Sequence, residues 1–314
     1  MRAKKILLTS IGIALLISGI SFFLRPISDF VYYNHSIILA VSVVILMVML
    51  AVQYKHTAIL RENERLYEEL KRKQAHIDRD MSMARSVQQG LLQKKLPVLH
   101  GCKIAAGCRP AAKIGGDFYG VKTKNNKIHF FLGDVAGHGI SSALVMALTE
   151  GLLRELLNTL DDPAQIIENL NVRLAEYLQD TISFVTLFYV CYEPRIRKLT
   201  YISAGQHPAL LFRGGKLQDK IQTGGSLLGM FTGCKFTARS LKLQKGDKLI
   251  CYTDGFTEAR NAAGEELGEE FIIDGVQKFI AKPVEKIKTE LYALIEQEAQ
   301  AINDDLSLLC FEAA

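Results

Sequence analysis

The stretch FFLGDVAGHGISSALVMA, residues Phe130–Ala147, passes from an apolar strand through a glycine-rich turn into the start of a predicted helix. Asp134 stands where the apolar run ends, next to Gly133 and shortly before Gly137. The backbone of an aspartate just past a hydrophobic strand is fixed by the sheet, and flanking glycine lets another group or an ion approach closely. The segment therefore predicts a carboxylate presented at the edge of a sheet.

Other carboxylates in the chain share this context of an apolar strand or turn followed by small residues. They are Asp117 in IGGDFYG, Asp254 in LICYTDGFTE, and Asp304 with Asp305 in AINDDLSLLCF. Several such strand ends that converge would leave like charges unpaired, which is costly unless cations neutralise them. One Asp-Gly pair alone is typical of an ordinary turn. Four in this arrangement favour an oxygen-ligand site for Mg²⁺ or Mn²⁺.

Short apolar runs punctuated by glycine extend from residue 97 to the end of the chain. Strands are predicted over residues 103–108, 127–132, 183–192, 199–203, 209–213, 236–243, 248–252 and 306–311. Helices are predicted over residues 140–159, 163–180, 269–280 and 283–302. The strands come largely as hairpins without regular strand-helix alternation. This pattern favours an α+β layered domain over a doubly wound parallel sheet.

Two apolar segments near the N-terminus, Ile6–Leu24 and Ser36–Tyr54, lack charged residues and each approach the length that spans a bilayer. A cleaved signal peptide is the alternative for the first segment, but no small-residue cleavage site follows it at Arg25-Pro26. Basic residues flank the pair on its outer sides, whereas residues 25–35 between the spans hold one Arg and one Asp. We therefore expect a multi-pass protein of the inner (cytoplasmic) membrane, with both termini cytoplasmic and a short outer loop at residues 25–35.

After the second span, residues 55–96 are polar, charged and almost free of Gly and Pro, which predicts one long helix. Residues spaced alternately by three and four form a seam that suits a parallel homodimer: Leu60, Asn63, Tyr67, Leu70, Gln74, Ile77, Met81, Ala84, Gln88 and Leu91. A solvated lone helix is the alternative, because several seam positions are polar. An imperfect seam of this kind could shift between registers and so carry a signal.

The charge and cysteine patterns exclude several classes of function. Residues 1–95 hold 14 basic and 7 acidic side chains, whereas residues 96–314 hold 24 and 26. The slightly acidic second part argues against nucleic acid as a partner. The six cysteines show no paired C-x-x-C spacing and no ligand spacing with the seven histidines. Neither a disulfide framework nor a zinc site is expected.

A series of motifs in a fixed order makes the second part of the chain recognisable. They are IGGDFYG, GDVAGHGISSALVMA, SFVTLFYV, YISAGQHPALL, GSLLGMF, CYTDGFTEARN and NDDLSLL, over essentially all of residues 97–312. This series resembles the bacterial PPM-type (2C-like) serine/threonine phosphatases, and within them the sporulation stage II protein E and sigma-factor-regulation branch. The segment ARSVQQGLLQKKLP, residues 84–97, is similar to the helix that precedes such domains.

The resemblance implies a layered α-β-β-α sandwich, with a centre for two divalent cations, Mn²⁺ or Mg²⁺, at one edge. By motif position, Asp134 would bridge both metals and the Val135 carbonyl would be an additional ligand. Asp117 would serve the second metal, while Asp254 and Asp304 would complete the first. Asp134 and Asp254 are the residues assigned to catalysis. No covalent enzyme intermediate is needed when two metals activate a water and stabilise an in-line displacement.

Some positions are weaker matches to the family pattern. Asp305 follows the expected ligand and is the less favoured member of its pair. Gly120 stands where many relatives carry an acid. The family uses an arginine near the first motif to grip phosphate, and here Arg109 and Lys113 are the nearby cations, with Lys113 as a weak candidate. His138 could act as a general acid, because an unperturbed histidine pKa lies near neutrality, or it could serve the turn before the helix.

We therefore expect a membrane anchor (residues 1–54), a helical dimerisation linker (55–96) and a PPM-type phosphatase domain (97–314). The expected substrate is a phosphoserine or phosphothreonine on a cytoplasmic regulatory protein, such as a STAS-type anti-sigma antagonist. The alternative is a catalytically inactive, membrane-tethered docking protein of the same fold. A diguanylate cyclase is disfavoured, because Phe118 occupies the position of the metal-binding Glu in IGGDFY.

Overall fold

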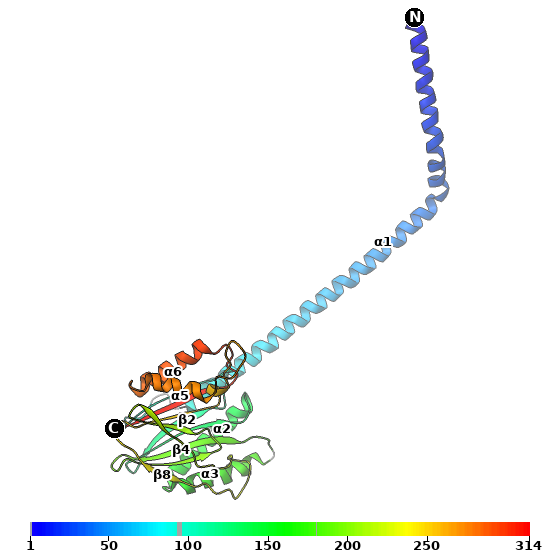
Figure 1. Cartoon of the computed structure of the whole chain (residues 1–314). Helices are drawn as coiled ribbons and strands as arrows, with labels where there is room; N and C mark the ends of the chain where they lie inside the picture. The colour runs from blue at the N-terminus through cyan, green and yellow to red at the C-terminus, as the bar shows by residue number, and fades with distance from the viewer. Residues whose placement is uncertain (1, 93–95, 180) are drawn as a thin grey trace. The chain divides into compact units, whose positions relative to one another are not determined.

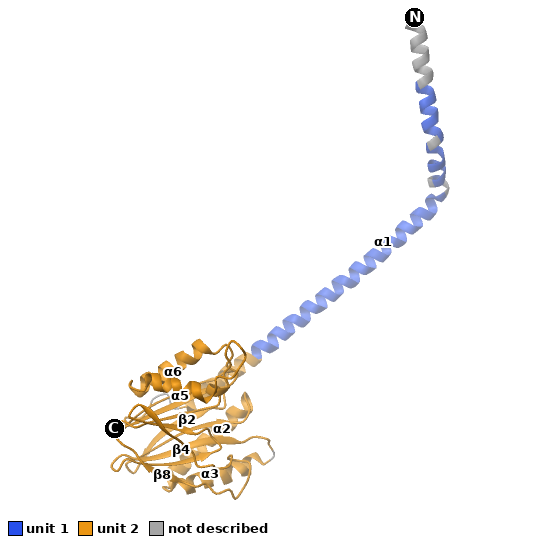
Figure 2. Cartoon of the chain, in the orientation of Figure 1, with its two compact units in different colours: residues 1–76 blue, residues 77–314 orange. Residues whose placement is uncertain are grey.

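The structure is a computed structural model that describes residues 2–92, 96–179 and 181–314. The chain divides into two compact units, Met1–His76 and Ile77–Ala314, which are coloured separately in Figure 2. The division at residue 76 lies inside the segment expected to be a linker. The predicted domain boundaries at residues 54 and 96 stay predictions.

Helix α1 runs over Arg2–Leu91 and contains Pro26. Two of its segments are long and apolar enough to cross a membrane: Ile13–Phe30, with a mean hydropathy of 1.5, and a window within Asn34–Leu91, with a mean hydropathy of 2.7. The sequence predicted a loop at residues 25–35, but the backbone there is helical. Polar side chains in this stretch bond to helical carbonyls: Ser28 donates to Arg25 O and Asn34 to Phe30 O. Such local bonds let polar residues remain inside a helix.

The second unit contains two five-stranded sheets in which all named strand pairs are antiparallel (Figure 1). The first sheet has the order β1 (Cys102–Arg109), β10 (Leu306–Ala313), β9 (Lys248–Tyr252), β6 (Ala209–Arg213) and β7 (Lys216–Ile221). The second has the order β2 (Phe118–Lys124), β3 (Lys127–Val135), β4 (Val185–Glu193), β5 (Lys198–Ala204) and β8 (Arg239–Lys242).

Helices cover the outer face of each sheet. Helices α2 (Ile140–Thr159) and α3 (Pro163–Leu178) share a buried apolar core with the second sheet. Helices α5 (Gly268–Phe279) and α6 (Val284–Glu298) share another with the first sheet, and the short α4 (Gly255–Glu258) joins it. A third core fills the space between the two sheets. The expected α-β-β-α sandwich is therefore confirmed.

Strand β3 shows how the sequence produces these layers. Ile128, Phe130 and Leu132 lie in the core between the sheets, and Phe131 and Val135 lie in the core under α2. Alternate residues of a strand point to opposite faces, so this run of apolar residues needs cover on both sides. The Phe130 ring stacks on Phe311 of the first sheet at a centroid distance of 5.2 Å. Full burial of each such side chain contributes about 1.5–3 kcal/mol to the free energy of folding.

Several elements differ from the sequence prediction. Strands β2 and β7 and helix α4 were not predicted, and the strand expected over residues 236–243 is confined to β8. The helix expected to end at residue 302 ends at Glu298. The predicted end of another helix, Asp180, lies outside the described residues, and α3 ends at Leu178. Helix α3 begins as expected at Pro163, where the Asp162 side chain accepts a hydrogen bond from Gln165 N–H.

Candidate metal centre

The four predicted carboxylates come from matching ends of the two sheets. Asp117 directly precedes β2, and Asp134 is the penultimate residue of β3, the antiparallel partner of β2. Asp254 follows β9 by two residues, and Asp304 precedes β10, the antiparallel partner of β9, by two. An antiparallel pair places the end of one strand beside the start of the next. Each sheet therefore places two carboxylates at the same end of its strands.

Two side chains that flank strands of the first sheet, one just after β9 and one just before β10, hold the loop that leads into β2 and carries Asp117. The Thr253 hydroxyl donates a hydrogen bond to Asp117 Oδ2 at 2.8 Å. The buried Asp305 carboxylate accepts from three backbone N–H groups: those of Ala111 at 2.9 Å, Gly116 at 2.7 Å and Asp117 at 3.3 Å. Carboxylates that accept several backbone N–H bonds are strong structural anchors. Asp305 therefore orients the loop that carries Asp117.

Glycine at Gly115 and Gly116 permits this close approach. A Cβ on Gly115 would lie 1.9 Å from Asp305 Oδ2, and a Cβ on Gly116 would lie 2.8 Å from the Val135 carbonyl oxygen. Gly120 is similarly constrained, because a Cβ there would meet the Phe131 ring at 2.3 Å. The absence of an acid at Gly120 thus follows from the aromatic ring that covers this position.

Burial and the charge of neighbouring carboxylates raise the pKa of several acids in this cluster. Burial, followed by the charge of Asp134, raises the pKa of Asp117 well above its usual value. Burial and then Asp254 raise the pKa of Asp134 to about 7. The pKa of Asp304 is raised by burial and by Asp254. Glu258, which the sequence analysis did not single out, has a pKa raised by burial and by Asp254 and Asp304, so it belongs to the same acidic cluster.

This cluster has the donor chemistry of a hard-cation site. Its oxygen donors are carboxylates, with the Val135 carbonyl close by, and mutual repulsion favours a neutralising divalent cation. Over residues 2–92, 96–179 and 181–314, no group of three or more His, Cys, Asp or Glu side chains is drawn close enough to form one coordination sphere. The residues therefore fit the chemistry of Mg²⁺ or Mn²⁺. In the part of the chain that the structure describes, their side chains do not form a complete ligand shell by themselves.

The weaker candidates occupy different environments. Lys113 forms an ion pair with Asp78 of α1. Arg109 forms one with Glu296 and lies over the Tyr292 ring, with 4.2 Å between the guanidinium carbon and the ring centroid. Neither cation is held toward the carboxylates by these contacts. His138 is exposed in the turn before α2, and its charge is the smallest of the named influences on the pKa of Asp304, which it lowers.

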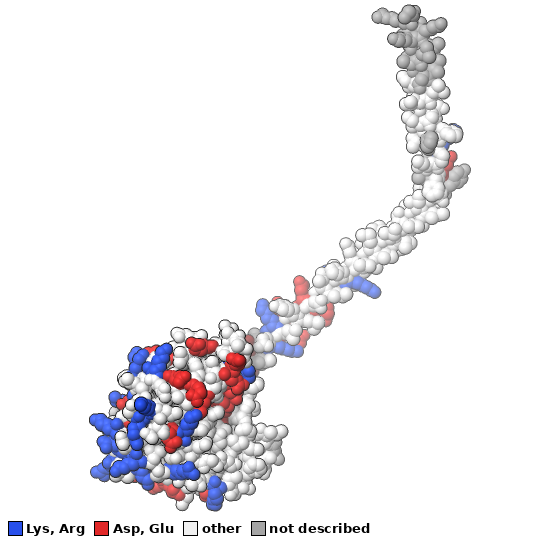
Figure 3. All heavy atoms as spheres, viewed as in Figure 1, with Lys and Arg blue, Asp and Glu red and all other residues white. Residues whose placement is uncertain are grey.

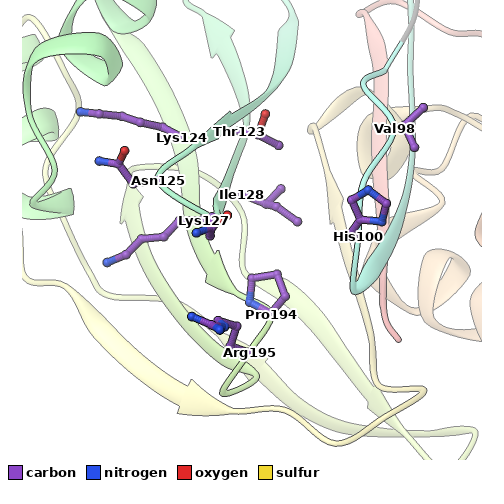
Figure 4. A pocket seen from close by; sticks show the side chains of 10 residues that line it. Val98, His100, Thr123, Lys124, Asn125, Lys127, Ile128, Pro194 and Arg195 are labelled. Atoms are coloured by element: carbon purple, nitrogen blue, oxygen red, sulfur yellow. The ribbon is translucent and has the colours of Figure 1, made fainter.

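A cavity of about 560 Å³ lies at the other end of the sheets (Figure 4). Lys124, Asn125 and Lys127 of the β2–β3 hairpin line it, together with His100 and Arg195. Strand β2 has seven residues, so this hairpin lies about 20 Å from the carboxylates at about 3.3 Å per residue. Basic side chains also concentrate around the C-terminus on the face shown in Figure 3. The carboxylate end and the cavity are therefore separate features.

Comparison with known proteins shows the family to which the chain belongs. The family model for stage II sporulation protein E (SpoIIE) matches residues 124–314, more than half of the chain. The chain belongs to the SpoIIE family. Phosphoserine phosphatase RsbU of Bacillus subtilis is 29% identical over 245 residues, which cover 75% of this chain and 70% of RsbU. The resemblance stated from the motifs is thereby confirmed, and the second unit is a PP2C-type phosphatase domain of the sigma-factor-regulation branch.

Solved structures support the same fold. The SiaA-PP2C domain of Pseudomonas aeruginosa superimposes with a TM-score of 0.66 at 21% identity, covering 77% of this chain and 98% of that one. The structure of the RsbU and RsbW domains of Rv1364c from Mycobacterium tuberculosis gives a TM-score of 0.61 at 24% identity, covering 71% of this chain and 63% of that one. The catalytic domain of PstP, solved with two manganese ions, gives 0.51 at 14% identity, covering 68% and 98%.

Proposed function

We propose that the chain is a membrane-anchored, metal-dependent protein phosphatase that hydrolyses phosphoserine or phosphothreonine on a cytoplasmic regulatory protein. Membership of the SpoIIE family and the named activity of RsbU support a serine/threonine phosphatase. The observation that carries the proposal is the convergence of Asp117, Asp134, Asp254 and Asp304 at one end of the sandwich, where burial and then the charges of Asp134 and Asp254 raise the pKa of Asp117, Asp134 and Asp304.

The proposed metal ligands are Asp117, Asp134, the Val135 carbonyl, Asp254 and Asp304. Divalent cations, when bound, would supply an activated water and would stabilise charge on the transferred phosphoryl group. The manganese ions in the PstP structure support Mn²⁺ or Mg²⁺ as the cofactor. The chain's own part is to orient these oxygens. Strand β3 fixes Asp134, and Thr253 and Asp305 fix the loop before β2.

The proposed partners follow from the family branch and from the first unit. A STAS-type anti-sigma antagonist is the proposed substrate, because the motifs resemble those of sigma-factor-regulation phosphatases and RsbU is named a phosphoserine phosphatase. The two apolar helical segments support a multi-pass anchor in the cytoplasmic membrane with both termini cytoplasmic. The heptad pattern of residues 60–77 supports a homodimer through the linker.

The test is hydrolysis of a phosphoserine protein by the purified full-length chain in detergent. We expect turnover with Mn²⁺ or Mg²⁺ and none after chelation with EDTA, because the oxygen donors bind hard cations. Asp254→Asn is the matched control for contaminating phosphatases and should be inactive under the same conditions. Undiminished turnover after verified metal removal would exclude the mechanism. Absence of turnover with every metal and several phosphoproteins would favour the inactive docking protein.

A further inference from the structure

Gln88, near the end of α1, contacts the loop that leads to Asp117. Its side-chain Nε2 donates to the Gly115 carbonyl oxygen at 2.6 Å, and its Oε1 accepts from the Gly115 N–H at 3.4 Å. The side chain is 5% exposed, whereas its neighbour Gln89 is exposed. Among the α1 side chains that the structure describes, Gln88 is the buried polar one. One amide therefore pairs with both polar groups of one glycine.

The opposite side of the same loop is held by Asp305. Its carboxylate accepts from the N–H groups of Gly116 and Asp117, one and two residues after the glycine that Gln88 holds. A Cβ on Gly115 would lie 1.9 Å from Asp305 Oδ2, so the loop fills the space between the two side chains. Gln88 and Asp305 together fix three consecutive peptide units, and the last of these carries Asp117.

The chemistry of this contact favours orientation over mere packing. An apolar side chain of similar length would fill the same space, but it would leave the buried N–H and carbonyl of Gly115 without these partners. The planar Gln88 amide donates to the Gly115 carbonyl and accepts from the Gly115 N–H, which belong to the two peptide units on either side of Gly115, so it resists rotation of both units as well as displacement. Rotation of the Gly115 peptide would redirect the chain two residues before the Asp117 carboxylate.

We propose that Gln88 is a positioning residue for the metal centre: it holds Gly115 so that Asp117 is presented to the cation before the cation binds. This inference rests on the proposed metal-dependent function. It assigns Gln88 a role in the affinity for metal, because a preorganised ligand loses less conformational freedom on binding. Turnover at saturating metal depends on Gln88 only weakly, since the bound cation then holds Asp117 in place.

The experiment compares three variants of the full-length protein in detergent. Gln88→Met keeps the length and removes both hydrogen bonds, Gln88→Glu keeps an acceptor and removes the donor, and Gln89→Met is the control on the adjacent exposed position. The first readout is the Mn²⁺ concentration that gives half-maximal activity, measured beside kcat at saturating Mn²⁺. The second is hydrogen exchange of residues 111–117 in the metal-free protein, which does not depend on activity.

Gln88→Met should raise the half-activating Mn²⁺ concentration about tenfold, from the loss of two hydrogen bonds of about 1 kcal/mol each or less. It should leave saturating kcat within about twofold and should speed exchange at residues 111–117. Gln88→Glu should also raise the half-activating Mn²⁺ concentration and speed exchange at residues 111–117. Gln89→Met should change neither quantity. Should Gln88→Met fail to fold, the Gln88→Glu readouts decide.

Wild-type metal dependence together with wild-type exchange in both Gln88 variants would overturn the proposal. A fall in kcat at saturating metal without a change in half-activation would overturn it too, because the residue would then act on the reaction itself. Failure of the proposed function looks different: no variant, nor the wild type, would respond to metal, whereas the exchange measurement would still report on the Gly115 contact.

Discussion

Two adjacent aspartates at the start of β10 have different surroundings. The Asp305 carboxylate is 6% exposed and accepts from the backbone N–H groups of Ala111, Gly116 and Asp117. Asp304 is half-buried, and its Oδ1 accepts from the N–H of Asp305 at 2.7 Å. Because its pKa is raised by burial and then by the charge of Asp254, the Asp304 carboxylate belongs to the acidic cluster. These surroundings support Asp304 as a ligand and Asp305 as an anchor.

The two substitutions should therefore separate activity from stability. Asp304→Asn should lower kcat/KM by about 10² or more, on the order of 3 kcal/mol of transition-state stabilisation, and should leave the metal-free protein folded. Asp305→Asn should lower the free energy of unfolding by about 1–3 kcal/mol, because the amide nitrogen that replaces one carboxylate oxygen cannot accept from the backbone N–H groups that bond to that oxygen. Urea unfolding and steady-state kinetics of both variants measure this. Wild-type activity in Asp304→Asn would reverse the assignment.

The buried pair of His129 and Tyr189 gives a pH dependence of stability. His129 Nδ1 lies 2.6 Å from the Tyr189 hydroxyl, and burial, followed by the charge of Lys124, lowers the His129 pKa to about 4. The unfolded histidine titrates near about 6.5, so the unfolded chain binds more protons between these two values. The contribution of the neutral His129 to the free energy of unfolding is therefore fully present above about pH 6.5. It is lost as the pH falls toward 4, and the loss is about 3 kcal/mol at most.

Replacing this histidine isolates its contribution from that of the acidic cluster. Without metal, the raised pKa of Asp134 acts in the opposite sense, because the folded state then binds the extra proton. We therefore expect the difference in unfolding free energy between wild type and His129→Gln, in urea titrations from pH 7 to 4, to shrink as the pH falls. A pH-independent difference would mean that His129 is not held neutral.

At the level of elements, long periodic segments were predictable and short or polar ones were not. Helix α2 and strands β6 and β9 have the predicted bounds, because apolar periodicity and flanking glycine define them. Strand β7, KLQDKI, is mostly exposed at the edge of its sheet and lacks an apolar alternation. Strand β2 follows directly on the GGD turn, and its glycine is packed under the Phe131 ring, so its strand character depends on tertiary contacts.

The same limit applies to the site. The types and flanking residues of Asp117, Asp134, Asp254 and Asp304 indicated a metal centre, since each stands beside glycine or another carboxylate at a strand end. The hydrogen bond from Thr253 to Asp117 joins residues 136 positions apart and leaves no local pattern. Gln88 illustrates the reverse case, because the heptad pattern placed it in a dimer seam and the structure buries it against Gly115.

Three seam positions of the first unit are exposed and are proposed to pair chains. Leu60, Tyr67 and Leu70 are each about half or more exposed. A cysteine at Leu70 should form a disulfide-linked dimer on mild oxidation, because seam positions of a parallel pair lie opposite their counterparts. Arg72→Cys, two residues later on the outer face of the heptad, is the control. The native cysteines lie outside this helix, at residues 102–310. Equal crosslinking at both positions would indicate random collision.

At the scale of the whole molecule, the charge distribution differs between the proposed anchor and the phosphatase part. Residues 1–95 carry a net charge of +7 and residues 96–314 a net charge of −2. The positive residues of the first part flank two segments that lack charge, which is the arrangement that orients membrane spans. The proposed metal-binding carboxylates lie wholly in the second unit. Under the proposed topology, substrate recognition takes place in the cytoplasm while the first unit fixes the location of the enzyme.

The orientation of the spans has a direct test in residues 25–35. The charge pattern predicts that this segment lies outside the membrane and that the chain reverses direction there, whereas the backbone through it is helical. Ser28→Cys in intact cells should react with a membrane-impermeant maleimide, and Thr57→Cys should react only after permeabilisation. The native cysteines lie in residues 102–310, on the proposed cytoplasmic side, and should stay unlabelled in intact cells.

Labelling of Thr57→Cys but not Ser28→Cys would invert the topology and place the phosphatase domain outside. Protection of both in intact cells would instead mean that residues 25–35 do not reach the outer surface, and the first segment would then not be a complete span.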